Sequence, residues 1–300
     1  MILKIIINTK GLMKMKKMIL IVCALVTALA MSTSAMAAFS DMPGGTDGEV
    51  LQKAVDNGLI TGFEDGTIQP ATPITRAQMA AIMSRAMNAQ KKADLAAFGD
   101  VNEGDWYFDA MSKAVAMGAF KGDTNNNLNP NNTITRQEAL IVLSRIFDMP
   151  PAKTNALEGF ADWESISSWA MKEVRRVVEA GYLTGITNIR PLDAMTRLEF
   201  AQIMDKIVGA YIDKSGEYAS LPHENVLIRA NGVILKDIKG AKNVYYGDGV
   251  EGDVTITDCE IGNLVVRGGK ATVSGGELER VRAVGSSVIA AAAVELEIDN

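Results

Sequence analysis

The sequence predicts an α+β multidomain protein, in which three helix–loop–helix repeats precede an all-β region. Two observations carry this prediction. A Thr-Arg pair recurs at residues 75–76, 135–136 and 196–197, and each copy opens an apolar-periodic stretch. After about residue 225, short runs of β-branched residues alternate with glycine-rich turns. A chain of 300 residues, 48% of them hydrophobic and 22% charged, has room for about two domains and is not disordered in composition.

The first 37 residues have the pattern of a secretory signal peptide. The basic segment 14–17 precedes the apolar run 18–30, and Ala35-Met36-Ala37 is a small-residue cleavage site, so we expect cleavage after Ala37. The alternative is a retained membrane anchor, but the apolar run is shorter than the ~20 residues that a spanning helix needs. The sequence therefore predicts a secreted protein with no membrane span after cleavage.

Charge and composition exclude several function classes. The five lysines of residues 1–37 leave with the signal, and the remaining 25 basic and 36 acidic side chains give a net charge of −11, which argues against a nucleic-acid partner. With 2 Cys and 1 His, the chain lacks the material for a disulfide scaffold or a Cys/His zinc site. The single His223 also disfavours a Ser-His-Asp enzyme. We predict no cofactor, no metal and no catalytic residue.

The three repeats share five fixed points. Each begins with Phe-x-Asp, and an apolar-periodic stretch then ends in a glycine that is followed by another glycine four residues later. A proline-containing loop and the Thr-Arg pair complete the pattern. Three matches of this kind are not a chance occurrence. The predicted segments are a signal peptide (1–37), three repeats (38–94, 95–156 and 157–212), a linker (213–225) and a β-region (226–300).

Each repeat predicts two helices. The first helices are expected at residues 50–57, 110–117 and 170–180, because each apolar stretch ends on a glycine suited to the left-handed C′ position. The second helices begin with a capping box, in which a Thr hydroxyl accepts from the third amide and the third side chain reaches back. They are expected to end near Met87, Phe147 and Val208. The box pairs are Thr75 with Gln78, Thr135 with Glu138, and Thr196 with Glu199.

The arginine after each capping threonine is unusual for a helix start. Arg76, Arg136 and Arg197 occupy the first helical position, where the helix dipole disfavours a cation by a few tenths of a kcal/mol. One interpretation is a structural ion pair to the capping-box acid or to the Asp of Phe-x-Asp. The other is an anion site, where the guanidinium and free helix amides converge on a carboxylate. The residues alone leave both open.

These motifs together resemble S-layer homology (SLH) domains, and the resemblance covers residues 39 to about 211 in three copies. It implies a pseudo-trimer of three helical prongs around a central bundle. It also implies non-covalent binding of an acidic, pyruvylated secondary cell-wall polysaccharide in grooves between the prongs. In the family, the arginine of the Thr-Arg pair and a tryptophan near the first helix contact the sugar. The positions that match are Arg76, Arg136 and Arg197 with Trp106 and Trp169.

Two repeats depart from the common pattern. In the first, Thr46 replaces the tryptophan within the loose segment 43–48, and Gln78 replaces the box glutamate. In the third, the loop at 186–193 is two residues shorter. We therefore expect one or two functional grooves rather than three. For each tryptophan, packing in the core is the competing interpretation.

The segment 123–127 begins like a calcium loop but fails the pattern. Leu128 stands where that loop needs glycine and Ile134 where it needs glutamate, so the segment predicts a polar turn rather than a cation site.

The β-region has a period near 17 residues. Val254 and Ile256 map onto Ala271 and Val273, and the shift continues less cleanly to Val288 and Ala290, which predicts a β-solenoid. A small antiparallel sheet is the alternative. No capping element is recognisable at the end of the sequence. We therefore expect either that the β-region is truncated or that self-association covers its open sheet edge.

These patterns favour a non-catalytic surface protein of the S-layer or surface-display type, whose partner is a cell-wall polysaccharide. One alternative is an SLH-anchored enzyme acting on polysaccharide, for which Asp248, Asp253 and Asp258 are candidate residues, although turn-forming Asp beside Gly explains them better. The other is a tether that binds modified peptidoglycan in a diderm envelope. The motifs of zinc peptidases, serine hydrolases and phosphate loops do not occur.

Overall fold

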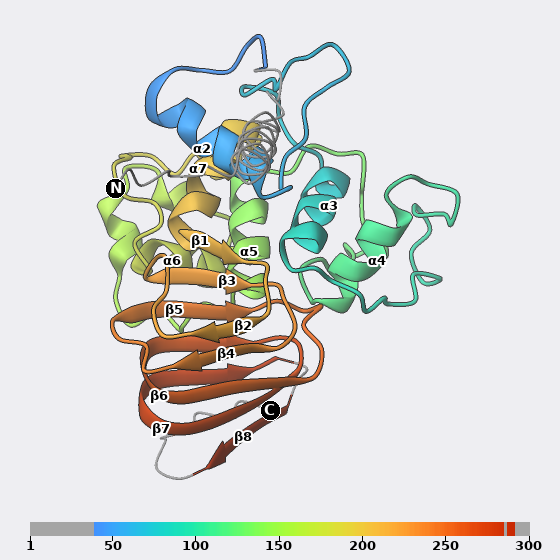
Figure 1. Ribbon diagram of the computed structural model, residues 1–300. Coiled ribbons are helices and arrows are strands. Elements are labelled where there is room, and N and C mark those ends of the chain that lie inside the picture. The colour runs from blue at the N-terminus through green and yellow to red at the C-terminus, as the bar shows by residue number, and fades with distance from the viewer. Residues whose placement is uncertain (1–38, 285–286, 292–300) are drawn as a thin grey trace, which may run out of the picture. The chain divides into compact units, whose positions relative to one another are not determined.

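The computed structural model describes residues 39–284 and 287–291, with side chains for 39–284 (Figure 1). The predicted signal peptide and residues 292–300 lie outside the described residues. In the part that is described, no helix is long and apolar enough to cross a membrane.

Each repeat folds into the two predicted helices. The first helices are α2 (Gly45–Asp56), α4 (Phe108–Ala116) and α6 (Met171–Glu179), and the second are α3 (Arg76–Ala86), α5 (Arg136–Ile146) and α7 (Arg197–Ile207). Two short 3₁₀ turns, Ala156–Gly159 and Trp163–Ser165, precede α6. All three predicted capping boxes are present. Helix α2 begins five residues earlier than expected, so the segment predicted as loose is partly helical.

The three repeats close on one another through a ring of backbone hydrogen bonds. The amide of Ile74 donates to Met195 O (2.9 Å), that of Met195 to Ile134 O (2.9 Å), and that of Ile134 to Ile74 O (3.0 Å). Each of these residues directly precedes a capping threonine, so all three second helices start from one point. Each second helix packs on the first helix of the following repeat, α3 on α4, α5 on α6 and α7 on α2. This cyclic order is the pseudo-threefold arrangement that the SLH resemblance implied.

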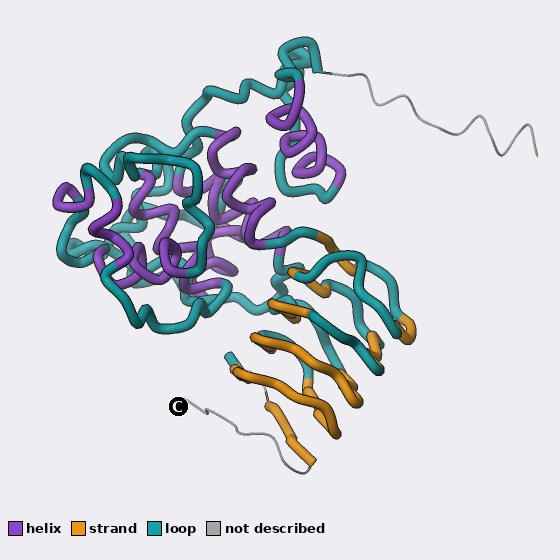
Figure 2. Tube along the Cα trace, turned by 90° about the vertical axis from the view of Figure 1, so that its left-hand side faces the viewer, coloured by secondary structure: helices purple, strands orange, loops and turns teal. Residues whose placement is uncertain are grey.

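Residues 210–284 and 287–291 form a parallel β-solenoid, and every strand pair within these ranges is parallel. One face consists of β1 (Ala210–Ile212), β3 (Asn225–Ile228) and β5 (Ala241–Tyr246), and the other begins with β2 (Gly216–Tyr218) and β4 (Val233–Lys236). The long strands β6 (Asp253–Val266) and β7 (Lys270–Ala283) run through both faces, and β8 (Ser287–Ala291) pairs with the start of β7. Figures 1 and 2 show the coils stacked one above another.

The register confirms the period of 17 predicted for the last coils. Val254 lies opposite Ala271 and Ile256 opposite Val273, and Ala271 and Val273 in turn lie opposite Val288 and Ala290. The inward-facing Val, Ile and Leu side chains of successive coils form the solenoid core. Parallel pairing throughout excludes the antiparallel sheet that the sequence had left open.

The predicted linker at residues 213–225 needs correction. Its residues 216–218 are strand β2, which pairs with β4, and strand β1 lies before it, inside the segment assigned to the third repeat. Each strand has three residues, too few to show a period in the sequence. They are strands because the next coil offers its backbone in parallel register.

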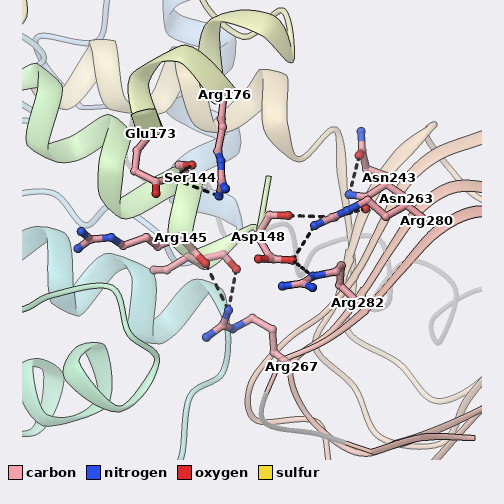
Figure 3. Close-up of polar contacts among 11 residues, drawn as sticks. Ser144, Arg145, Asp148, Glu173, Arg176, Asn243, Asn263, Arg267, Arg280 and Arg282 are labelled. Carbon is pink, nitrogen blue, oxygen red and sulfur yellow. Dashed lines mark hydrogen bonds and ion pairs between the residues drawn. The ribbon is translucent and has the colours of Figure 1, made fainter. Parts of the chain in front are cut away.

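The solenoid contacts the second repeat through buried arginine (Figure 3). Arg267, only 3% exposed, donates to the carbonyl oxygens of Met117 (2.6 Å), Ile146 (3.1 Å) and Arg145 (3.5 Å). These oxygens lie at the ends of α4 and α5, where helices leave carbonyls without intrahelical partners and favour a cation. Beside them, the Asp148 carboxylate accepts from Arg280 (2.9 Å) and Arg282 (2.7 Å).

Candidate functional site

The arginines of the Thr-Arg pairs tie each repeat to the next. Arg76 Nη1 pairs with Glu138 (2.8 Å) and Arg136 Nη1 with Glu199 (3.0 Å), so each arginine meets the capping-box acid of the following repeat. Arg197 has no such partner, because the first repeat carries Gln78 at the box position. The structural ion-pair interpretation is therefore confirmed for two of the three arginines. Burial lowers the pKa of Arg76 and of Arg136, and the paired glutamates oppose that shift.

The Asp of each Phe-x-Asp motif contacts a loop rather than an arginine. Asp100 accepts from the amides of Leu128 (2.9 Å) and Asn129 (2.6 Å), and Asp41 and Asp162 hold the equivalent amides of their own repeats. The carbonyl of Leu128 then accepts from Arg76 Nε (2.7 Å), and the same contact occurs at Arg136 and Arg197. Each loop is thus held on one side by an aspartate and on the other by an arginine of the preceding repeat.

This arrangement predicts that Asp100→Ala lowers the free energy of unfolding by about 2–3 kcal/mol, because it removes two charge-assisted hydrogen bonds that position a loop shared between repeats. Asp100→Asn, which keeps one acceptor, should lose about half of that. Urea unfolding of the three proteins measures the difference. A loss below about 0.5 kcal/mol for the alanine variant would contradict the role assigned to this carboxylate.

The helix amides are not free for an anion, contrary to one interpretation of the sequence. The amides of Arg76 and Ala77 donate to Asn132 O (2.9 Å) and Pro130 O (2.8 Å), and the third amide of the helix donates to Thr75 Oγ1 (3.2 Å). The starts of α5 and α7 repeat this pattern with their neighbouring loops. Loop carbonyls therefore occupy the donors that would have bound a carboxylate.

Both predicted tryptophans are exposed, which contradicts the alternative that they pack in the core. Trp106 is 67% exposed and Trp169 is 61% exposed. Trp169, from the third repeat, lines a cavity of about 820 Å³ together with Arg76 of the first repeat and Glu138 of the second. We call it the Arg76 cavity; its lining also includes Phe120, Lys121 and Arg145.

The position one repeat further on is much smaller. Arg136 lines a cavity of about 110 Å³, where Arg190 and Arg136 both pair with Glu199. By the cyclic order of the repeats, the residue that corresponds to Trp169 here is Thr46, which offers no aromatic face. The Arg136 position therefore has neither the volume of the Arg76 cavity nor its tryptophan side chain.

The third arginine is held differently. Arg197, 7% exposed, donates to Ile68 O (2.7 Å) and Thr61 O (2.5 Å), and its guanidinium lies 4.9 Å from the ring centre of Phe63. Carbonyls and an aromatic ring thus take the place of the missing glutamate. By the same cyclic order, Trp106 corresponds here to Trp169.

Two residues that line the Arg76 cavity, Lys121 and Arg145, were not predicted from the sequence. Lys121 lies three residues after the helix-ending Gly118, and Arg145 lies nine residues after Arg136. A cation occurs at the position of Arg145 in the other two repeats as well, as Arg85 and Lys206, so an alignment of the repeats could have identified it. The position of Lys121 is a lysine in the second repeat alone, so a comparison of the repeats could not have identified it.

The other candidate residues have structural explanations. The Asp123 carboxylate accepts from the amides of Asn125 (2.8 Å) and Asn127 (2.9 Å), as expected of a polar turn, and these bonds lower its pKa. Asp258 is a left-handed corner of the solenoid, with φ 53°, and the residue one coil on is Gly275. Asp253 is an exposed residue that begins β6, whereas Asp248 is buried.

The fold and these contacts define a class of proteins with three tandem helix–loop–helix repeats closed into a ring. The S-layer homology domain model matches residues 38–80, 97–140 and 159–201. The chain therefore carries three SLH domains and is a secreted cell-surface protein.

The relatives share the helical part within much longer chains. A surface-layer 125 kDa protein of Lysinibacillus sphaericus is 31% identical over 53% of this chain and 14% of its own. An S-layer protein of Bacillus thuringiensis subsp. finitimus is 27% identical over 66% of this chain and 25% of its own. An amylopullulanase of Thermoanaerobacterium thermosulfurigenes is 30% identical over 59% of this chain and 10% of its own. The chain thus spans at most a quarter of these relatives.

Proposed function

We propose that this protein is a non-catalytic surface protein whose SLH domains bind an acidic, pyruvylated secondary cell-wall polysaccharide, and that it serves in an S-layer or in surface display. The observation that carries the proposal is the Arg76 cavity. It has room for a saccharide, presents the exposed Trp169, and draws residues from all three repeats. An exposed aromatic face beside polar groups is suited to a sugar ring with its apolar and hydroxyl-bearing sides.

The Arg76 cavity is the main binding position in this proposal. The Arg136 position is too small and lacks a tryptophan, and at Arg197 the guanidinium is covered by Phe63 and two carbonyl groups. Direct binding by all three arginines, as the family resemblance implied, therefore has less support than binding at one position. The role of Arg136 and Arg197 in this proposal is to hold the ring of repeats together.

An anchored enzyme is the second candidate, since an amylopullulanase shares the helical repeats. The similarity covers 10% of that relative, so its activity does not transfer through it. In this chain the three candidate aspartates lie at a corner, at a strand start and in a buried turn, which supports a structural role for them.

Sedimentation with cell walls tests the proposal. The chain from residue 38 onward is mixed with native walls, or with walls stripped of secondary polysaccharide, and the bound fraction is measured. We expect binding to native walls and a loss of at least tenfold in affinity on stripping. Equal binding to both preparations would identify peptidoglycan as the ligand and contradict the proposed one, and binding to neither would contradict wall anchoring itself.

A further inference from the structure

The arginine that the family pattern selects is already engaged by neighbouring residues at two of its three nitrogens. Arg76 Nε donates to Leu128 O, Nη1 pairs with Glu138, and the guanidinium lies 5.0 Å from the ring centre of Phe120. Its charge is balanced by the glutamate and its position is fixed by the neighbouring repeat. These contacts are those of a structural tie between repeats.

Two other cations of the Arg76 cavity are largely uncommitted. Lys121 is exposed and makes no hydrogen bond or ion pair with any other residue in the range 39–284. Arg145 makes one weak contact, from Nη1 to Ala119 O at 3.4 Å. Figure 3 shows that the Arg145 side chain extends away from Asp148. Glu173 acts on Arg145 without an ion pair to it and pairs with Arg176 (3.4 Å) instead.

The equivalent cations of the other repeats are occupied. Arg85 donates to Gly58 O (2.9 Å) and Leu59 O (2.6 Å). Lys206 donates to the carbonyl oxygen of Thr184 (3.0 Å) and to its hydroxyl (3.3 Å). Thr184 and Thr61 stand at the position of Lys121 in their repeats, so both other repeats lack that second cation.

The charged side chains that line the Arg76 cavity indicate the charge of the ligand that would fit it. Glu138 balances Arg76, and the carboxylate of Asp123, which also lines the cavity, is engaged by loop amides but keeps its charge. Lys121 and Arg145 then leave one net positive charge, which a single carboxylate would neutralise. The flanking Trp169 supplies the face for the sugar that bears it.

We propose that Lys121 and Arg145 bind the carboxylate of a monoanionic sugar unit in the Arg76 cavity, and that Arg76 itself acts as a positioning residue. This inference rests on the proposed function and identifies which groups of that site recognise the acidic ligand. A planar guanidinium and an ammonium group together suit one carboxylate, since both donate charge-assisted hydrogen bonds to it.

The test measures affinity for an oligosaccharide of one repeating unit, released from native walls, by calorimetric titration of the chain from residue 38 onward. The variants are Lys121→Thr, which installs the residue of the other two repeats, Arg145→Gln, and their double. Each single change is expected to weaken binding about tenfold, and the double by more. Arg85→Gln is the matched control, because it removes the equivalent but occupied cation, and its affinity should change less than twofold.

A second arm uses the same oligosaccharide with its carboxylate reduced to an alcohol. The unaltered chain and the double variant should bind this neutral sugar equally, which a merely structural effect of the substitutions would not produce. If the unaltered chain binds the acidic sugar and the double variant binds it as tightly, this inference is overturned while the proposed function stands. If the unaltered chain binds neither sugar, both fail.

Discussion

Arg267→Leu is expected to lower the free energy of unfolding of the chain by about 3–5 kcal/mol, the largest effect of any single substitution considered. The side chain is buried and donates to three main-chain carbonyl oxygens at the ends of α4 and α5. Leucine would fill part of the volume but leave those acceptors buried without donors. Removal of a buried charge is often tolerated when its charged partner is replaced at the same time. Here the partners are main-chain carbonyl groups, which a substitution at Arg267 does not remove.

Urea unfolding followed by circular dichroism at 222 nm measures this loss. Lys242→Ala is the control, since Lys242 pairs with Glu224 on the exposed surface of the solenoid and its removal should change stability by less than about 0.5 kcal/mol. Because Arg267 belongs to the solenoid and its acceptors to the helices, we expect the helical signal to be lost at lower urea in the Arg267 variant. A variant as stable as the unaltered chain would contradict the importance of this contact.

Trp169→Ala is expected to weaken binding to native cell walls by tenfold or more. The indole is 61% exposed and lines the Arg76 cavity, so its removal deletes the aromatic face without opening a void in the core. A stacking contribution of about 1.4 kcal/mol or more corresponds to this factor. The measurement is a sedimentation isotherm with native walls.

Two further tryptophans serve as controls for that experiment. Trp163 lies in the 3₁₀ turn before α6 and does not line the Arg76 cavity, so Trp163→Ala should leave affinity within twofold. Trp106 is as exposed as Trp169 and, by the cyclic order of the repeats, corresponds to it at the Arg197 position. We expect Trp106→Ala to weaken wall binding less than Trp169→Ala does. The reverse order would move the main binding position to Arg197.

The repeat architecture could be predicted from the sequence because its signals are local. A capping box needs only two side chains three residues apart, and a left-handed glycine marks the helix end. The sequence therefore predicts the start of every helix to within two residues except that of α2, which begins five residues earlier. The period of 17 likewise followed from Val254, Ile256 and their successors, because parallel stacking repeats the same environment coil after coil.

Contacts between repeats could not be predicted in the same way. No local signal shows that Arg76 reaches Glu138 of the next repeat, or that loop carbonyls occupy the helix amides. The exposure of Trp169 depends on which helix packs on which. Strand β2 could not be predicted because a strand of three residues is too short to show a hydrophobic period. The contact of Arg267 could not be predicted because its partners are main-chain carbonyls more than 100 residues away in the sequence.

The most direct test of the account is the stoichiometry of saccharide binding. Calorimetric titration of the chain from residue 38 onward with an acidic oligosaccharide of one repeating unit should show one site per chain, and Trp169→Ala should weaken that site. This result would place wall binding in the Arg76 cavity formed by all three repeats. Three equivalent sites per chain, or a single site that is unchanged by Trp169→Ala, would contradict it.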